Sequence, residues 1–191
     1  CIRDRAGGFR PGHFVSVFGA GSIGLAGIAL AKAAGAGKIV AFEVSKPRLD
    51  LAKTVGADYA YDPREVHAGE VLMELSDGAG FDFHVEAAGV PELTIPEMEE
   101  GLAINSKIVQ IGRAAKRVPM YLEAFQVRRA QAYGAQGHSG HETFPNVIRL
   151  VASGRVDLSP IITSRYGLDD TLDAIAKSTD RTDGKILVKP N

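Results

Sequence analysis

Three glycines spaced as G-x-G-x-x-G stand between an expected strand and an expected helix, where they can admit an anionic ligand. The strand covers residues 13–18 (HFVSVF), and an alanine-rich helix follows the glycines. Gly19 permits a tight turn out of the strand, and Gly21 lacks a side chain, so a ligand can approach the backbone. Gly24 allows the helix to pack closely on the strand. The spacing therefore predicts a turn that holds phosphate groups.

The start of the helix and a later acidic residue extend this pattern. Free N–H groups near Ser22 and Ile23 lie at the positive end of the helix dipole, which favours a pyrophosphate. Glu43 ends the next expected strand, nineteen residues after Gly24, where a carboxylate can accept hydrogen bonds from both ribose hydroxyls of an adenosine. We therefore predict that residues 13–62 form a strand–helix–strand unit that binds a nicotinamide dinucleotide.

Residues around Glu43 bear on which dinucleotide binds. A carboxylate repels a 2′-phosphate, which favours NAD over NADP. Lys46 and Arg48 follow Glu43 closely. They would clamp the adenine ribose, accommodate a phosphate if Glu43 turns away, or simply remain solvated on the second helix. NADP therefore stays open as the less favoured cofactor.

Strand and helix patterns alternate along the chain, which predicts an α/β fold: a Rossmann-type, doubly wound parallel sheet in three layers. A dinucleotide-binding domain is expected over residues 1–157, followed by a helix–strand tail over residues 158–191. Expected strands are 13–18, 38–44, 58–61, 81–86, 107–111 and 131–135, and expected helices are 22–34, 46–55, 65–76, 92–102 and 144–152.

Composition narrows the class of protein. A net charge of −1, with 45% apolar and 24% charged residues, is ordinary for a globular protein and argues against nucleic acid as the main partner. No apolar run is long enough to span a membrane. One cysteine, Cys1, excludes an internal disulfide framework and fits a reducing, cytoplasmic compartment. The opening Cys1–Arg5 matches neither a secretory signal nor an initiator methionine, so we expect the cut edge of a larger protein.

The order of motifs makes the chain resemble a known family along essentially its whole length. The motifs are Pro11-Gly12, GAGSIG, AKAAGA, FEVSKPRLDLAKTVGADYAYDP, FDFHVEAAG and IVQIGR. Together they resemble the cofactor domain of zinc-dependent medium-chain dehydrogenases, which include alcohol, sorbitol and threonine dehydrogenases. The segment FQVRRAQAYGAQGHSGHETFPNVIRLVASGRVDL is most similar to members that act on cyclic polyols such as inososes.

The resemblance implies which residues bind the cofactor. They comprise the glycine turn, the ribose acid and its basic neighbour, and the ends of the fourth and fifth strands. In full they are Gly19, Gly21, Ser22, Ile23, Gly24, Glu43, Arg48, Ala87, Ala88, Gly89, Ile111, Gly112 and Arg113. No catalytic residue and no metal ligand is implied within this chain.

One departure from the family limits the expected activity. The family holds zinc with a Cys, a Gly-His-Glu motif and an acidic residue in an N-terminal domain, and these have no counterpart here. We expect zinc only in a separate catalytic domain, against which the tail would pack. The chain would then be the cofactor domain of an NAD-dependent alcohol or polyol dehydrogenase, inactive alone. The resemblance also implies a homo-oligomer.

Alternatives remain open at this stage. The chain would otherwise be a non-catalytic dinucleotide-binding or sensor module, or an NADPH-dependent, zinc-independent quinone or enoyl reductase. His138 and His141 lack further ligands nearby, which disfavours zinc and leaves either a role near substrate or cofactor or a structural loop. His84 is interpreted as a hydrogen-bonded core residue. Glu86, at the mouth of its strand, is left open as a residue near the cofactor.

Overall fold

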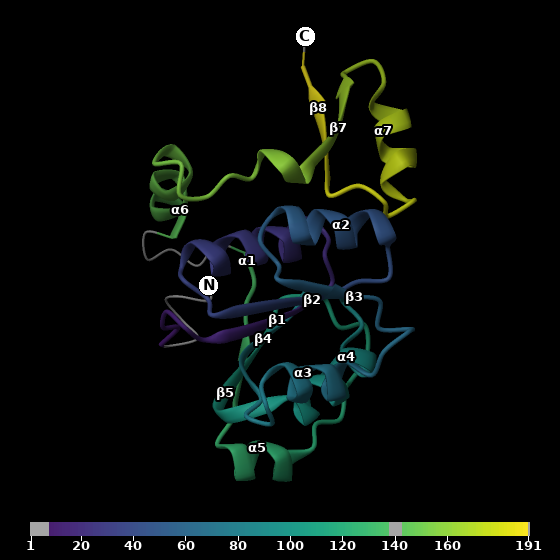
Figure 1. Cartoon of the computed structure of the whole chain (residues 1–191). Helices are drawn as coiled ribbons and strands as arrows, with labels where there is room; N and C mark the ends of the chain where they lie inside the picture. The colour runs from purple at the N-terminus through teal and green to yellow at the C-terminus, as the bar shows by residue number, and fades with distance from the viewer. Residues whose placement is uncertain (1–7, 138–142, 191) are drawn as a thin grey trace.

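A computed structural model describes residues 8–137 and 143–190 (Figure 1). The strands are β1 (Phe14–Phe18), β2 (Lys38–Phe42), β3 (Tyr59–Tyr61), β4 (Phe81–Glu86), β5 (Leu102–Gln110), β6 (Gln131–Gly134), β7 (Ile162–Gly167) and β8 (Lys185–Lys189). The helices are α1 (Ser22–Ala33), α2 (Lys46–Thr54), α3 (Ala68–Leu75), α4 (Pro91–Glu100), α5 (Leu122–Arg128), α6 (Thr143–Ala152) and α7 (Thr171–Ser178), with a 3₁₀ turn at Ser159–Ile161.

Six strands form one parallel sheet in the order β3-β2-β1-β4-β5-β6. The chain first adds strands on one side of β1 and then continues on the other side with β4. The strand order therefore reverses between β1 and β4, and ligands of such sheets bind outside the carboxyl ends of the strands at this point. The predicted Rossmann-type fold class is confirmed.

Helices cover both faces of the sheet, as Figure 1 shows: α1 and α2 lie on one face, and α3, α4 and α5 on the other. Side chains alternate along β1, so Val15 and Val17 pack with α1 while Phe18 packs toward α3 and α4. Both faces are apolar, which explains why the strands read as nearly continuous hydrophobic runs.

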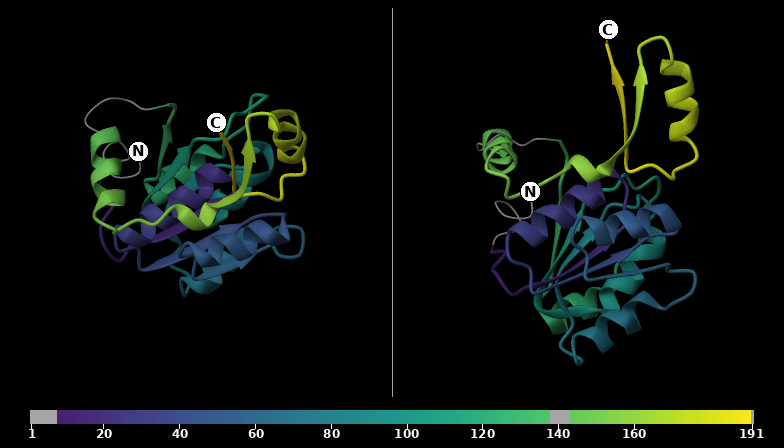
Figure 2. Two further views of the ribbon diagram at one scale, coloured as in Figure 1. Left: turned by 90° about the horizontal axis from the view of Figure 1, so that it is seen from above. Right: turned by 45° about the horizontal axis from the view of Figure 1, so that its top comes forward.

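The tail forms a small unit of its own that projects from the helical layer (Figure 2). It consists of β7 and β8, paired in parallel, with α7 between them in sequence. The predicted boundary between residues 157 and 158 falls inside a segment whose Val156 and Ile161 are both buried in the core of the main sheet. That boundary stays a prediction.

Three elements differ from the sequence expectation. Helix α3 begins at Ala68 rather than at Glu65, and β5 begins at Leu102, so this leucine belongs to a strand and not to the preceding helix. Helix α5 was not predicted. Cys1, His138 and His141 lie outside the described residues. Among the helices that are described, none has both the length and the hydropathy needed to cross a bilayer.

Candidate functional site

The glycine turn after β1 is shaped by two close approaches that exclude side chains. Gly19 has a φ of +92°, and a Cβ there would lie 2.6 Å from the backbone nitrogen of Ala88. A Cβ on Gly24 would lie 1.8 Å from the carbonyl oxygen of Gly19. These glycines thus bring the ends of β1 and β4 and the start of α1 into direct contact, in agreement with the roles inferred from sequence.

Gly21 differs from the other two because its missing side chain leaves open space. The atom nearest to a Cβ there is Nη1 of Arg48, at 3.9 Å. Gly21 is the N-cap of α1, and it has no side chain to accept a bond from the helix start. The first N–H groups of a helix have no intrahelical acceptor, so those of Ser22 and Ile23 remain available to a ligand. The Ile23 side chain is 56% exposed beside them.

The Glu43 carboxylate fastens the turn to the end of β2. Its Oε2 accepts a hydrogen bond from the Ala20 N–H at 2.8 Å, and its Oε1 accepts from Val44 at 2.8 Å and from Ser45 at 3.0 Å. A carboxylate has about four acceptor positions. In this arrangement Glu43 keeps about one free, which suffices for one ribose hydroxyl rather than the two expected from sequence.

The two basic residues that follow Glu43 have different surroundings. Lys46 pairs with Asp50 at 2.7 Å and is 76% exposed, which fits the solvated alternative. Arg48 donates from Nε to the carbonyl oxygen of Asp183 at 2.9 Å, while its Nη1 lies over Gly21. Arg48 therefore extends across the open side of the glycine turn.

Glu86, the last residue of β4, organises the neighbouring strand ends although it is fully buried. Its Oε1 accepts hydrogen bonds from the N–H groups of Ala88 and Gly89 at 3.1 and 2.9 Å, and its Oε2 accepts from Gln110 at 2.8 Å. A Cβ on Gly112 would lie 2.2 Å from Oε2, so only glycine fits there. Glu86 thus supports the loops instead of facing a ligand.

The remaining residues implied by the resemblance lie on those two loops. The Ala87 N–H donates to the Phe18 carbonyl oxygen at 2.8 Å, and the Ile111 N–H donates to the Glu86 carbonyl oxygen at 2.9 Å. Ala88 and Arg113 are exposed at the same carboxyl edge of the sheet. The structure therefore places all thirteen residues at the ends of β1, β2, β4 and β5 or on the helices that follow β1 and β2.

His84 lies inside the sheet, as its position in an apolar strand suggested. Its Nδ1 is 2.8 Å from the Ser16 hydroxyl oxygen, and the residue is fully buried. Burial lowers the pKa of the His84 imidazole to about 3, so this histidine is neutral at physiological pH. It contributes to the core and not to the site.

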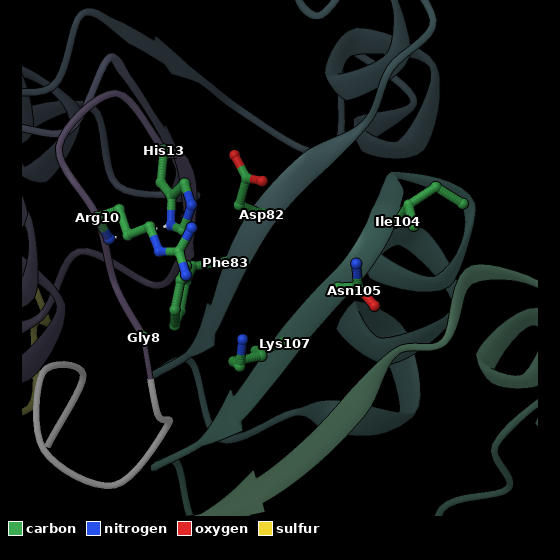
Figure 3. Close-up of a pocket in the computed structure, with 8 residues that line it drawn as sticks. All are labelled: Gly8, Arg10, His13, Asp82, Phe83, Ile104, Asn105 and Lys107. Carbon is green, nitrogen blue, oxygen red and sulfur yellow. Dashed lines mark hydrogen bonds between the residues drawn. The ribbon is translucent and has the colours of Figure 1, made fainter.

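A cavity of about 340 Å³ lies at the opposite edge of the sheet (Figure 3). It is lined by Gly8, Arg10, His13, Asp82, Phe83, Ile104, Asn105 and Lys107. These residues precede β1, lie in the first half of β4 or lie within the first six residues of β5, whereas the glycine turn follows the carboxyl end of β1. The cavity is therefore separate from the candidate dinucleotide site.

Metal binding finds no support in the part of the chain that the structure describes. Within residues 8–137 and 143–190, His, Cys, Asp and Glu form no group of three or more that would hold a metal ion. The donor set that zinc requires is thus not met there.

Sequence reasoning missed or undervalued three residues near the site. Glu86 was noted without a role. Arg64, in the loop after β3, donates to the carbonyl oxygen of Val44, the residue after Glu43, at 2.8 Å. Asp183 contacts Arg48 from the tail, 135 positions away in sequence. A usable signal existed for Glu86, which ends a predicted strand, and for Arg64, which follows the end of another at the same edge of the sheet.

A reversal of strand order next to a glycine turn and an open helix N-terminus defines a Rossmann-type domain. The family model described as zinc-binding dehydrogenase matches residues 22–153, and the chain belongs to this family. The resemblance inferred from the motifs is confirmed.

Individual relatives agree with this placement. Scyllo-inosose 3-dehydrogenase of Thermotoga maritima is 42% identical over 96% of this chain and 48% of its own length. L-threonine 3-dehydrogenase of Pyrococcus abyssi is 35% identical over 92% of this chain and 51% of its own length. The chain thus spans about half the length of the curated relatives it matches.

Solved structures give the same result. A Thermotoga maritima protein described as an alcohol dehydrogenase superposes with a TM-score of 0.91 at 41% identity, over 97% of this chain and 48% of that one. The 2R,3R-butanediol dehydrogenase of Bacillus subtilis gives 0.86 at 28% identity, over 96% of this chain and 52% of that one. The relatives are oxidoreductases, which supports a dehydrogenase role.

Proposed function

We propose that this chain binds NAD(H) and forms the cofactor-binding part of a dehydrogenase that acts on a small alcohol or polyol. The observation that carries the proposal is the open face of Gly21, next to the unpaired N–H groups at the start of α1. The names of the relatives, an inosose dehydrogenase, a threonine dehydrogenase and a butanediol dehydrogenase, support the class of substrate.

The chain's own residues bind and orient the dinucleotide. The N–H groups of Ser22 and Ile23 bind the pyrophosphate, and Glu43 accepts a hydrogen bond from an adenosine ribose hydroxyl. The strand-end residues Ala87–Gly89 and Ile111–Arg113 line the path toward the nicotinamide. A bound nicotinamide would accept or donate the hydride. Zinc chemistry would need ligands that the described residues of this chain do not supply.

NAD is proposed over NADP on electrostatic grounds. Glu43 is held in place by three backbone donors, so turning it away to admit a 2′-phosphate would break all three hydrogen bonds. Arg48 and Arg64 lie nearby, but Arg64 already pairs with Asp62, whose carboxyl pKa this arginine lowers. The 2′-phosphate would therefore meet a fixed negative charge.

The direct test is a titration of the 191-residue chain with NADH and with NADPH. The chain contains no tryptophan, so the fluorescence of the reduced nicotinamide itself serves as the signal. We expect saturable binding of NADH and at least about tenfold weaker binding of NADPH, which corresponds to about 1.4 kcal/mol. Tighter binding of NADPH would favour the quinone or enoyl reductase alternative.

A measurement of substrate turnover distinguishes a dehydrogenase component from a non-catalytic sensor module. We expect negligible alcohol or polyol oxidation by the 191-residue chain with NAD and Zn²⁺, because the zinc donor set is not met among its described residues. Combined with a zinc domain from a relative, the chain should give substrate-dependent NADH formation. A non-catalytic module would bind NADH and remain inactive in both settings.

Two further proposals, a homo-oligomer and a domain boundary near residue 157, do not depend on which cofactor binds. Strand β6 forms one edge of the main sheet, and no strand among the described residues pairs with its outer side, so β6 can pair with a second copy. Light scattering of the chain tests this directly. The cytoplasmic location remains an expectation from composition.

A further inference from the structure

The dipeptide Asp183-Gly184 joins the tail to the proposed cofactor site. It lies immediately before β8. The carbonyl oxygen of Asp183 accepts a hydrogen bond from Arg48, and that of Gly184 accepts one from the Ser22 hydroxyl. Two consecutive carbonyls of the tail therefore bind two residues beside the glycine turn.

The packing around Gly184 leaves this segment little freedom. Gly184 is buried, and a Cβ there would lie 2.6 Å from the Ile161 carbonyl oxygen. It would also meet the side chains of Leu25 and Leu51 at 3.1 and 3.2 Å. The segment is thus fitted at Gly184 between α1, α2 and the 3₁₀ turn.

The Asp183 side chain provides the second restraint. Its Oδ1 accepts hydrogen bonds from the hydroxyls of Thr163 and Ser164 at 2.6 and 2.5 Å, both on β7. These bonds hold the pKa of the Asp183 carboxyl below its usual range, so it is ionised at neutral pH. Oδ2 is buried, lacks a hydrogen-bond partner within the described residues, and lies 3.9 Å from the Lys177 ammonium. A carboxylate that is only 10% exposed and has such anchors serves position rather than solubility.

The direction of the Arg48 side chain depends on the position of the Asp183 carbonyl group. Because Nε is bound to the Asp183 carbonyl, the other end of the guanidinium is directed over Gly21. A free arginine on an exposed helix samples many rotamers and loses that freedom on binding a ligand. An arginine already restrained over the turn loses less, so it binds an anionic ligand more tightly.

We infer that Asp183 is a positioning residue for the dinucleotide, acting from the tail through Arg48. The inference rests on the proposed function, since it assumes that the dinucleotide lies over Gly21. It also makes cofactor affinity depend on how β7 and β8 are held, so the tail and the cofactor influence each other.

The test measures NADH dissociation constants for variants of the 191-residue chain. Asp183→Ala removes the carboxylate, and the pair Thr163→Val and Ser164→Ala removes its partners while leaving residue 183 intact. Each change should weaken NADH binding by about five- to tenfold, because ordering the released Arg48 side chain on binding costs about 1 kcal/mol or slightly more. The matched control is Asp180→Ala, which removes an exposed partner of Lys177 and should change the constant less than about twofold.

A double-mutant cycle separates positioning from general damage. In an Arg48→Met background, Asp183→Ala should add less than about a twofold effect, because the residue through which it acts is gone. An unchanged five- to tenfold loss in that background would overturn the inference. Thermal unfolding of each variant identifies misfolding. If Asp183→Ala unfolds, the Thr163→Val and Ser164→Ala pair gives the decisive value.

The two proposals fail in different ways. Absence of NADH binding by the parent chain overturns the proposed function together with this inference. Binding by the parent, with the same dissociation constant in every Asp183, Thr163 and Ser164 variant, overturns the positioning role alone.

Discussion

The contrast between Gly21 and Gly24 gives a sharp test of how the turn works. A methyl group on Gly21 would meet only Nη1 of Arg48 at 3.9 Å, and the residue's φ of −71° suits alanine. Gly21→Ala should therefore fold, losing about 1 kcal/mol or less of unfolding free energy from the weaker N-cap. The added methyl occupies the space through which a pyrophosphate approaches. Crowding of one methyl costs about 1–3 kcal/mol, so NADH should bind about five- to 150-fold more weakly.

Gly24→Ala should give the opposite result. Its Cβ would lie 1.8 Å from the Gly19 carbonyl oxygen, which the backbone can relieve only by moving α1. We expect a loss of about 3 kcal/mol or more in unfolding free energy. Urea unfolding measures stability, and NADH fluorescence measures binding in the same samples. If Gly21→Ala binds NADH as the parent does, or if Gly24→Ala matches the parent's stability, the inferred roles of these glycines are wrong.

Three further predictions concern buried or charged groups. Glu43→Gln should narrow the preference for NADH over NADPH by about fivefold, since one unit charge near the 2′-phosphate is worth about 1 kcal/mol, while Lys46→Gln should leave the preference unchanged; titration with both cofactors measures it. His84 has a folded pKa of about 3, below its unfolded value of 6.5, so its stabilising contribution is complete above pH 6.5 and declines as pH falls toward 3. Between pH 7.5 and pH 5 the parent should therefore lose about 2 kcal/mol of unfolding free energy relative to His84→Gln. Urea unfolding at both pH values measures this loss, and an equal loss in the two proteins would contradict the linkage. Gly112→Ala should lower the thermal midpoint, because its Cβ would lie 2.2 Å from the Glu86 carboxylate; an unchanged midpoint would show that the loop can relax.

Local patterns predicted much of the fold. Strand β4 was expected at its observed bounds, and α1 and α2 ended within one residue of expectation because glycines follow them. Helix α5 was not predicted because its apolar Leu122 and Val127 are exposed, so only Ala124 and Phe125 pack on the core, and seven residues carry little periodicity. Strand β5 was expected too short because Asn105 and Ser106 resemble a turn, although Ser106 is buried and bonds to the Phe81 carbonyl oxygen.

The places of the proposed site residues in the fold could be predicted from the sequence, but their hydrogen bonds could not. Motif spacing located Glu43 and Gly112 because spacing along parallel strands determines which residues reach one edge. It did not reveal that Glu43 already binds three backbone donors, or that Gly112 is required by Glu86. The contact between Arg48 and Asp183 was also hidden, since it joins the start of α2 to the tail and depends on tertiary packing.

The pairing of β1 with β4 has a consequence for how the chain folds. Ser16 and His84, neighbours across this pair, are 68 residues apart in sequence. Closing a loop of that length costs about 4 kcal/mol of chain entropy before any contact forms. Far fewer residues separate β1 from β2, so pairing these two strands costs less entropy. The two halves of the sheet should therefore assemble separately and join late, at the seam where Gly19 meets Ala88. A dinucleotide would recognise only molecules that have completed this last step, so its presence during refolding should favour the joined state over half-assembled ones.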